Sequence, residues 1–268
     1  MKIYDCFTYL NEDLILDIRF NILNKYVDYF IIIEANKTHS GESKKKNFDV
    51  NKFPKFKQKI IYFFITDIPS SKDRWGLENF QRNYIKTALK NTNIHNRDYV
   101  IISDADEIPN LEKIKNIKIN EKDIYAFEQS TFYYKINLLN PKDTPWYGSR
   151  LVFYKKLNNS TPQLIRSSKC KQYPFWRLDK TRNVKIIKNG GWHFSYLNNV
   201  KKIQYKLKSF AHSEFSSNKF LNKKKINEKL KNLKDLFNDN VVLKKIKIDN
   251  GFPSYILKNK KKLNKWIL

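Results

Sequence analysis

The chain has 268 residues, of which 41% are hydrophobic and 15% aromatic, so it can bury a sizeable core and is not disordered over most of its length. Its formal net charge of +27 suggests nucleic acid or an anionic surface as a partner. Only 8 of the 53 basic residues are Arg, however, and nucleic-acid recognition favours Arg over Lys. We therefore expect most of this charge to be solvated surface, with no nucleic-acid partner. Two cysteines are too few for a disulfide framework or a thiolate zinc site.

Several features of the sequence bear on the location of the protein in the cell. No apolar run approaches the ~20 residues of a membrane span. Asp5, Glu12 and Asp13 fall in the window where a secretory signal would be apolar. These features predict a cytoplasmic protein that begins at Met1, without a signal peptide or transmembrane segment. Residues 201–268 carry 19 Lys, no Arg and 5 acidic residues, which predicts a peripheral contact with an anionic membrane.

Strand and helix patterns alternate over the first 110 residues, which is typical of an α/β layer with a mostly parallel sheet. The strand patterns include near-continuous apolar runs, as expected where both faces of a sheet are covered. A long polar loop is expected over 36–58. The predicted elements, in chain order, are a strand at 2–10, a helix at 12–25, strands at 28–35 and 60–65, a helix at 77–91 and a strand at 98–103.

The pattern changes after Pro109, where strands follow one another without long helices between them. This change indicates an antiparallel or mixed continuation of the sheet. The predicted strands lie at 123–139, 149–155 and 184–188. From about residue 198 the chain is expected to be helical and basic.

No Gly-, Ser- or Pro-rich linker and no internal repeat divides the chain. We therefore expect one domain over residues 1–268. Its first part, 1–110, is expected to bind a nucleotide-containing donor. Its second part, 111–268, includes the basic helical region and is expected to bind an acceptor.

The sharpest chemical signal is the motif Ser103-Asp104-Ala105-Asp106-Glu107, which directly follows an apolar strand. Ligands of open α/β sheets bind at strand ends, and carboxylates two residues apart can reach one hard divalent cation together. Such a cation would leave coordination positions for diphosphate oxygens and would neutralise charge on a departing nucleoside diphosphate. Alternatively, Asp104 or Asp106 caps the turn before Pro109, and Glu107 is solvated.

Glu78 and Arg82 lie one turn apart on the second predicted helix. In one interpretation they form a surface ion pair worth ~0.3–0.5 kcal/mol. In the other, the guanidinium of Arg82, which is one of the few Arg residues, binds a phosphate through two hydrogen bonds. The spacing alone leaves both interpretations open.

Two further motifs occur late in the chain. In Gly190-Gly191-Trp192-His193, the glycines allow close backbone approach to a ligand, and His193 can complete a metal site as a neutral imidazole. Alternatively, the glycines form a turn and His193 lies in the core. Glu214 is an acid in a cationic segment, where Lys residues favour the ionised form that a general base requires. Otherwise Glu214 is a surface acid or a helix cap.

Trp146 and Tyr147 follow Pro145 in a predicted loop. Aromatic faces suit sugar rings and bases alike, so both residues are candidate ligand contacts. In the simpler interpretation they anchor the loop and are half-buried.

Taken together, the order and spacing of these pieces resemble glycosyltransferase family 17. Residues 5–42, with Glu12 and Arg19 on the helix and Glu34 at the end of the next strand, resemble the opening of that family. The segment YVIISDADEIP resembles the central acidic motif of the family, GGWHFSYL its late Gly-Trp-His motif and PSYILKN its ending.

The resemblance implies a GT-A-like fold with a Rossmann-like central sheet, inversion at the anomeric carbon and a UDP-sugar donor, expected to be UDP-N-acetylglucosamine. It implies a divalent metal, Mn²⁺ or else Mg²⁺, with ligands from Asp104, Asp106 and His193. The implied nucleotide-sugar contacts are Glu34, Asn36, Lys37, Thr38, Arg82 and Asp104. Trp146, Tyr147 and Trp192 are expected to contact the acceptor. The expected general base is Glu214, with Glu128 in reserve.

The sequence therefore predicts a metal-dependent, inverting glycosyltransferase that acts on a glycan or lipid-linked acceptor. One alternative is a nucleic-acid- or anionic-surface-binding protein that uses the basic last third. A metal-dependent hydrolase is a second alternative, although the His-rich constellation usual for such sites is missing from the sequence. A glycosidase is a third, but its carboxylate pair cannot be identified from sequence.

Overall fold

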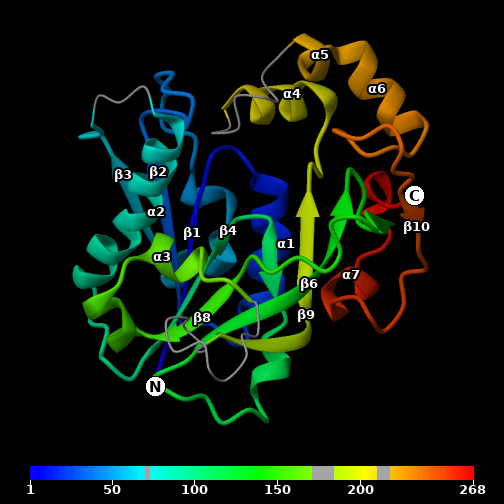
Figure 1. The fold of residues 1–268 in the computed structure, drawn as a ribbon. Helices are drawn as coiled ribbons and strands as arrows, with labels where there is room; N and C mark the ends of the chain where they lie inside the picture. The colour runs from blue at the N-terminus through cyan, green and yellow to red at the C-terminus, as the bar shows by residue number, and fades with distance from the viewer. Residues whose placement is uncertain (70–72, 171–183, 210–217) are drawn as a thin grey trace, which may run out of the picture.

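The computed structural model of the chain describes residues 1–69, 73–170, 184–209 and 218–268. These residues form an α/β structure around one large mixed sheet (Figure 1). Its strand order is β10-β7-β6-β8-β4-β1-β2-β3, and β9 pairs with both β5 and β6. The sheet therefore takes strands from both predicted halves of the chain.

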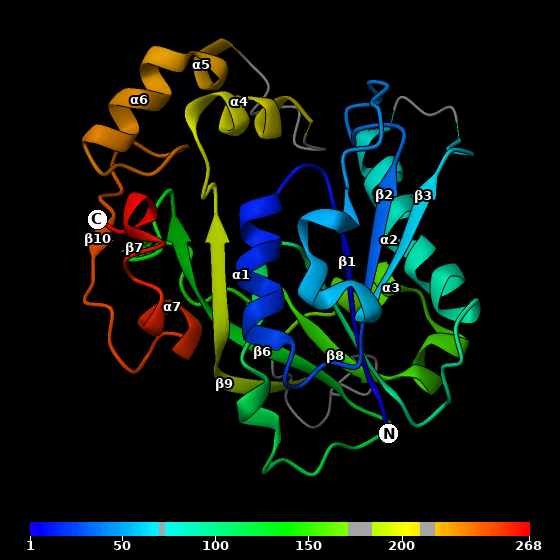
Figure 2. The ribbon, with the colours of Figure 1, turned by 180° about the vertical axis from the view of Figure 1, so that it is seen from behind.

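The first half builds the parallel part of the sheet. β1 pairs in parallel with β2 and β4, and β2 pairs in parallel with β3. Helix α2 covers one face of these strands and α1 the other, which explains why their side chains are almost all apolar (Figures 1 and 2). The elements are β1 (Ile3–Thr8), α1 (Asp13–Leu23), β2 (Tyr29–Ala35), β3 (Ile60–Ile65), α2 (Arg74–Lys90) and β4 (Tyr99–Asp104).

The strands and helices predicted for this half are confirmed. The loop predicted over 36–58 differs, because it contains two short 3-10 helices, η1 (Val50–Lys52) and η2 (Pro54–Lys59). Phe53 lies between these two helices and Phe56 lies within η2. Both rings are buried and pack on Phe20 of α1. Apolar burial thus gives structure to a segment whose composition is polar and Lys-rich.

The second half continues the sheet in mixed orientation, as predicted. β8 is antiparallel to β4 and β6, whereas β9 runs parallel to β6 and antiparallel to β5. The strands are β5 (Glu107–Pro109), β6 (Ile124–Tyr133), β7 (Leu138–Leu139), β8 (Arg150–Phe153), β9 (Val184–Ser195) and β10 (Lys244–Lys245).

Gly190 and Gly191 lie within β9 and not in a turn. A Cβ at Gly190 would lie 2.6 Å from the carbonyl oxygen of Ile187, and one at Gly191 would collide with the carbonyl oxygen of Ile108. Gly191 also has a φ of +145°, which L side chains rarely adopt. The two glycines therefore allow close approach of backbone to backbone, which corrects the expectation that they approach a ligand.

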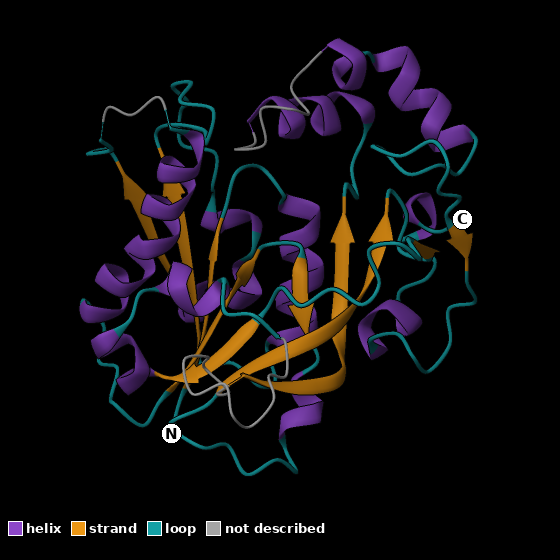
Figure 3. Ribbon diagram, in the orientation of Figure 1, coloured by secondary structure: helices purple, strands orange, loops and turns teal. Residues whose placement is uncertain are grey.

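Short helices complete the structure around the sheet. Figure 3 shows α4, α5 and α6 lying across the end of the sheet toward which β6 and β9 point. In the described part of the chain no helix has both the length and the apolar character needed to cross a membrane. The remaining elements are η3 (Leu111–Ile114), η4 (Tyr154–Asn159), α3 (Pro162–Arg166), α4 (Val200–Ser209), α5 (Asn218–Leu221), α6 (Lys223–Lys231), α7 (Ser254–Lys258) and η6 (Asn264–Trp266).

Candidate active site

A pocket of about 460 Å³ lies at the carboxyl ends of the parallel strands, bordered by α2 and α4. Residues at or shortly after the ends of three strands line it: Tyr9 follows β1, Thr38 lies three residues beyond β2, and Asp104 is the last residue of β4. This is the edge at which open α/β sheets bind their ligands. Seven of the predicted site residues line the pocket, namely Lys37, Thr38, Arg82, Asp104, Asp106, Trp146 and His193.

Asp104 lies between two arginines. Its Oδ1 accepts a hydrogen bond from Arg82 at 2.9 Å, and its Oδ2 accepts one from Arg166 at 3.0 Å. Burial by itself would raise the pKa of Asp104, but the two guanidiniums outweigh burial and hold that pKa below its usual range. Arg82 also pairs with Glu78 at 2.7 Å. The predicted ion pair is therefore present, but it is built around a buried Arg at the pocket and is not a surface pair.

Glu107 is fully buried and organises one wall of the pocket. Its Oε1 accepts hydrogen bonds from Trp146 Nε1 at 2.6 Å and from Arg166 at 2.5 Å, and its Oε2 accepts one from the Asp104 amide at 3.0 Å. Gly148 is needed beside it, because a Cβ there would collide with the Glu107 carboxylate and the Trp146 indole. The alternative of a solvated Glu107 is therefore wrong.

Asp106 faces both His193 and Lys206. His193 Nε2 lies 3.7 Å from Asp106 Oδ1, and Lys206 donates to Asp106 Oδ2 at 2.7 Å. The other ring nitrogen of His193, Nδ1, lies 3.5 Å from Thr131 Oγ1, and the ring stacks on Trp146. Burial raises the pKa of Asp106, but Lys206 and His193 outweigh burial and lower it. His193 is therefore a pocket residue that faces a carboxylate, and not a core histidine.

The three predicted metal ligands, Asp104, Asp106 and His193, differ in whether their ligand atoms are already occupied by protein groups. The Asp106 carboxylate and the His193 imidazole, whose Oδ1 and Nε2 lie 3.7 Å apart, are the pair that would hold a divalent cation. Asp104 does not fit as a third ligand, because a guanidinium occupies each of its oxygens. Within the described ranges, no three His, Cys, Asp or Glu side chains are grouped so that they could hold a metal ion. Of the three predicted ligands, Asp106 and His193 are thus the two that face each other in the pocket.

Two residues predicted to contact the nucleotide lie outside the pocket lining and bind other parts of the chain. Glu34 is fully buried and does not line the pocket. Its carboxylate accepts hydrogen bonds from Lys44, from the Tyr62 hydroxyl and from the backbone amides of Asn47 and Phe48. It therefore anchors the loop after β2. The Asn36 side chain donates to the Thr66 carbonyl at 3.1 Å and also lies outside the pocket lining.

The reserve base and one predicted acceptor contact bind each other away from the pocket. Glu128 accepts hydrogen bonds from the Tyr147 hydroxyl at 3.1 Å and from Lys188 at 2.7 Å. Neither Glu128 nor Tyr147 lines the pocket, so the structure does not bring these two predicted residues to the acidic motif. Glu214 lies outside the described residues.

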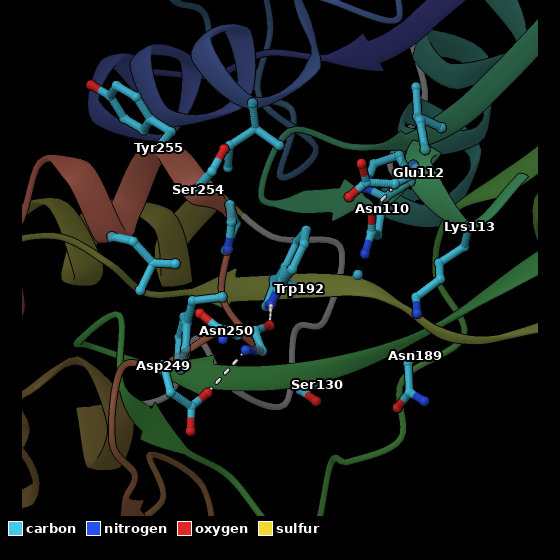
Figure 4. Close-up of a pocket in the computed structure, with 18 of the residues that line it drawn as sticks. Asn110, Glu112, Lys113, Ser130, Asn189, Trp192, Asp249, Asn250, Ser254 and Tyr255 are labelled. Carbon is cyan, nitrogen blue, oxygen red and sulfur yellow. Dashed lines mark hydrogen bonds between the residues drawn. The ribbon is translucent and has the colours of Figure 1, made fainter. Parts of the chain in front are cut away.

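Trp192 occupies a different cavity from His193, its neighbour on β9, because successive strand residues point to opposite faces. The second cavity measures about 730 Å³, and the Trp192 indole donates to the Gly251 carbonyl within it at 3.0 Å. Figure 4 shows Trp192 among polar side chains that include Asn110, Ser130, Asn189 and Asn250. Trp192 is therefore not an acceptor contact at the pocket of the acidic motif.

Several pocket residues were missed by reasoning from the sequence. They are Tyr9, His39, Gln81, Asp143, Arg166 and Lys206. The scarcity of Arg was an available signal for Arg166. Lys206 carries no such signal, because it lies in a segment where Lys is abundant.

The fold and the pocket define an α/β protein whose candidate site is rich in cations and carboxylates at the carboxyl edge of its sheet. The family model described as glycosyltransferase family 17 matches residues 1–241. The chain therefore belongs to glycosyltransferase family 17 and is a glycosyltransferase.

Individual relatives match a shorter region. Over 113 residues the chain is 29% identical to the β-1,4-mannosyl-glycoprotein 4-β-N-acetylglucosaminyltransferases of Homo sapiens and Rattus norvegicus, and 28% identical to that of Mus musculus. Each match covers 39% of this chain and 21% of the relative. The similarity thus spans about a fifth of the length of these curated relatives.

Proposed function

We propose that this glycosyltransferase moves a sugar from a UDP-sugar, expected to be UDP-N-acetylglucosamine, to a hydroxyl of a glycan or lipid-linked acceptor. The observation that carries the proposal is the grouping of Arg82, Arg166 and Lys206 around Asp104 and Asp106 at the strand ends. Cations placed in this way can bind a diphosphate. The similarity to N-acetylglucosaminyltransferases supports N-acetylglucosamine as the sugar.

The proposal includes a GT-A-like fold. Two features of the sheet support it: the parallel block β3-β2-β1-β4, and the antiparallel continuation through β8. The acidic motif begins in the last two residues of β4, the strand at which these two parts meet.

Arg82 and Arg166 are the proposed ligands of the diphosphate. Both line the pocket and both are charged at any physiological pH, so they stabilise negative charge that develops on the leaving group. Asp106 and His193 would hold a divalent cation, Mn²⁺ or else Mg²⁺. That cation, when bound, supplies further neutralisation of the departing diphosphate.

Inversion requires one general base on the acceptor hydroxyl, on the side opposite the leaving group. We propose Glu214 for this role, because the lysines of its segment favour the ionised carboxylate that a base requires. Asp143 is the competing candidate from the structure, because it lines the pocket and its Oδ2 accepts a hydrogen bond from the Tyr133 hydroxyl at 2.7 Å.

A panel of UDP-, GDP- and CDP-sugars with Mn²⁺ tests the donor. A ligand that binds only the folded state stabilises it by mass action, so UDP-N-acetylglucosamine should raise the melting temperature and be turned over. Arg82→Met should lose this shift, whereas Lys115→Met, at an exposed ion pair, should keep it. Absence of any shift at millimolar UDP-sugar, or equal shifts with all three nucleotides, would contradict the proposed donor.

A further inference from the structure

The two oxygens of the Asp106 carboxylate face two different groups. On one side Oδ1 faces His193 Nε2 at 3.7 Å. On the other side Lys206 donates to Oδ2 at 2.7 Å. The Lys206 and Asp106 side chains are only 16% and 8% exposed, so water screens this pair weakly. A cation on Asp106 would therefore be repelled by the Lys206 ammonium.

Asp106 is not the only group near the Lys206 ammonium. Lys206 lies on α4, and its Nζ is 4.0 Å from Glu12 Oε1 and 5.7 Å from the centre of the Tyr196 ring. A lysine carries a compact charge on a flexible four-carbon stem, so it can turn toward another anion while α4 stays in place. A diphosphate in the same pocket would be such an anion.

We propose that Lys206 is a counterion that holds Asp106 until the donor binds, and then moves to the donor diphosphate while a divalent cation takes its place on Asp106. This inference rests on the proposed use of a nucleotide-sugar. It has two consequences. The cation binds weakly when no nucleotide is present. Nucleotide and cation also strengthen each other's binding, because the nucleotide draws the competing ammonium away from Asp106.

Binding of Mn²⁺, followed by the electron paramagnetic resonance signal of free Mn²⁺ with and without UDP, tests the inference. Without UDP, Lys206→Met should bind Mn²⁺ about tenfold more tightly than the wild type, because the competing charge is gone. The gain in Mn²⁺ affinity on adding UDP should be about tenfold smaller in this variant than in the wild type. Lys206→Arg keeps the charge and should retain most of the UDP-dependent gain.

Lys208→Met is the matched control, because Lys208 is exposed on the same helix and its loss changes the net charge equally. It should behave as the wild type in both titrations. Asp106→Asn should abolish Mn²⁺ binding both in the wild type and in Lys206→Met. This result would show that the titrations report on the Asp106 carboxylate. Circular dichroism and melting temperatures establish that each variant is folded.

The outcomes are distinct. If Lys206→Met binds Mn²⁺ alone no more tightly than the wild type, Lys206 does not compete for Asp106 and the inference is overturned. If that affinity rises but the UDP-dependent gain is unchanged, the move to the diphosphate is overturned. If UDP does not bind the wild type, the proposed donor is wrong, and the comparison with Mn²⁺ alone still decides whether Lys206 competes.

Discussion

Arg166 donates a hydrogen bond to Asp104 at 3.0 Å, although the two residues are 62 positions apart and belong to α3 and β4. The same guanidinium nitrogen binds Glu107 at 2.5 Å. One arginine therefore compensates two neighbouring carboxylates, of which Glu107 is fully buried. This contact ties the acidic motif to α3 and positions both carboxylates before any ligand binds.

Replacement of Arg166 by Met should destabilise the protein strongly. Removing one partner of a buried ion pair leaves an uncompensated buried charge, here on Glu107, which costs about 3–5 kcal/mol. Urea unfolding measures the loss. The control is Lys115→Met at the exposed pair with Glu112, where less than about 1 kcal/mol is expected. Equal effects in the two variants would contradict the structural role of Arg166.

Replacement of His193 by Ala should lower turnover by roughly 10²-fold or more while the protein stays folded, because a proposed ligand of the catalytic cation is lost. Asp106→Asn should have a similar effect. His95→Ala is the matched control, since His95 is exposed and remote from the pocket lining. Initial rates at several Mn²⁺ concentrations test the prediction. Unchanged metal-dependent turnover in His193→Ala would remove it from the site.

Replacement of Glu34 by Gln should reduce stability and leave nucleotide affinity unchanged. The carboxylate pairs with buried Lys44 and holds the loop after β2, so about 3 kcal/mol of unfolding free energy is expected to be lost. Glu42→Gln, at an exposed position of the same loop, should cost little. The comparison needs urea unfolding and UDP binding at a temperature where both variants are folded. Weaker UDP binding by folded Glu34→Gln would restore the nucleotide role predicted from the sequence.

The identity of the base can be decided by two conservative variants. Glu214→Gln should reduce the turnover number by roughly 10²-fold or more, with little change in the KM for the donor, because a base acts on the acceptor hydroxyl. Asp143→Asn should then have only a small effect. The opposite result would move the role to Asp143, which lines the pocket.

The two tryptophans of the predicted acceptor site should respond differently to replacement by Phe. Trp146→Phe loses the hydrogen bond to Glu107 and changes the ring that stacks on His193, so donor binding and turnover should both fall. Trp192→Phe loses the hydrogen bond to Gly251 and part of a buried ring, so it should cost at least about 1 kcal/mol of stability without altering donor affinity. Steady-state kinetics and urea unfolding distinguish these effects. A loss of donor affinity in Trp192→Phe would show that the two cavities are coupled.

The sequence by itself determined the alternation of strands and helices, the mixed second half of the sheet and the position of the acidic motif at a strand end. Each of these follows from local periodicity: apolar runs of strand length, amphipathic helices, and polar residues where a buried strand stops. The order and spacing of motifs also indicated the family. The family resemblance, and not local spacing, placed His193 and Arg82 with the acidic motif, and both line the same pocket as that motif.

Only the tertiary structure decided which charges meet. Glu34 is the second-last residue of β2 and Asp104 is the last residue of β4. Glu34 is nevertheless enclosed by the loop after β2, whereas Asp104 faces the pocket between two arginines. Lys206 reaches Asp106 from 100 residues away, which no local pattern could reveal among so many lysines. The physical reason is that a buried charge must find its compensating partner in space, and that partner is chosen by packing and not by neighbourhood in the sequence.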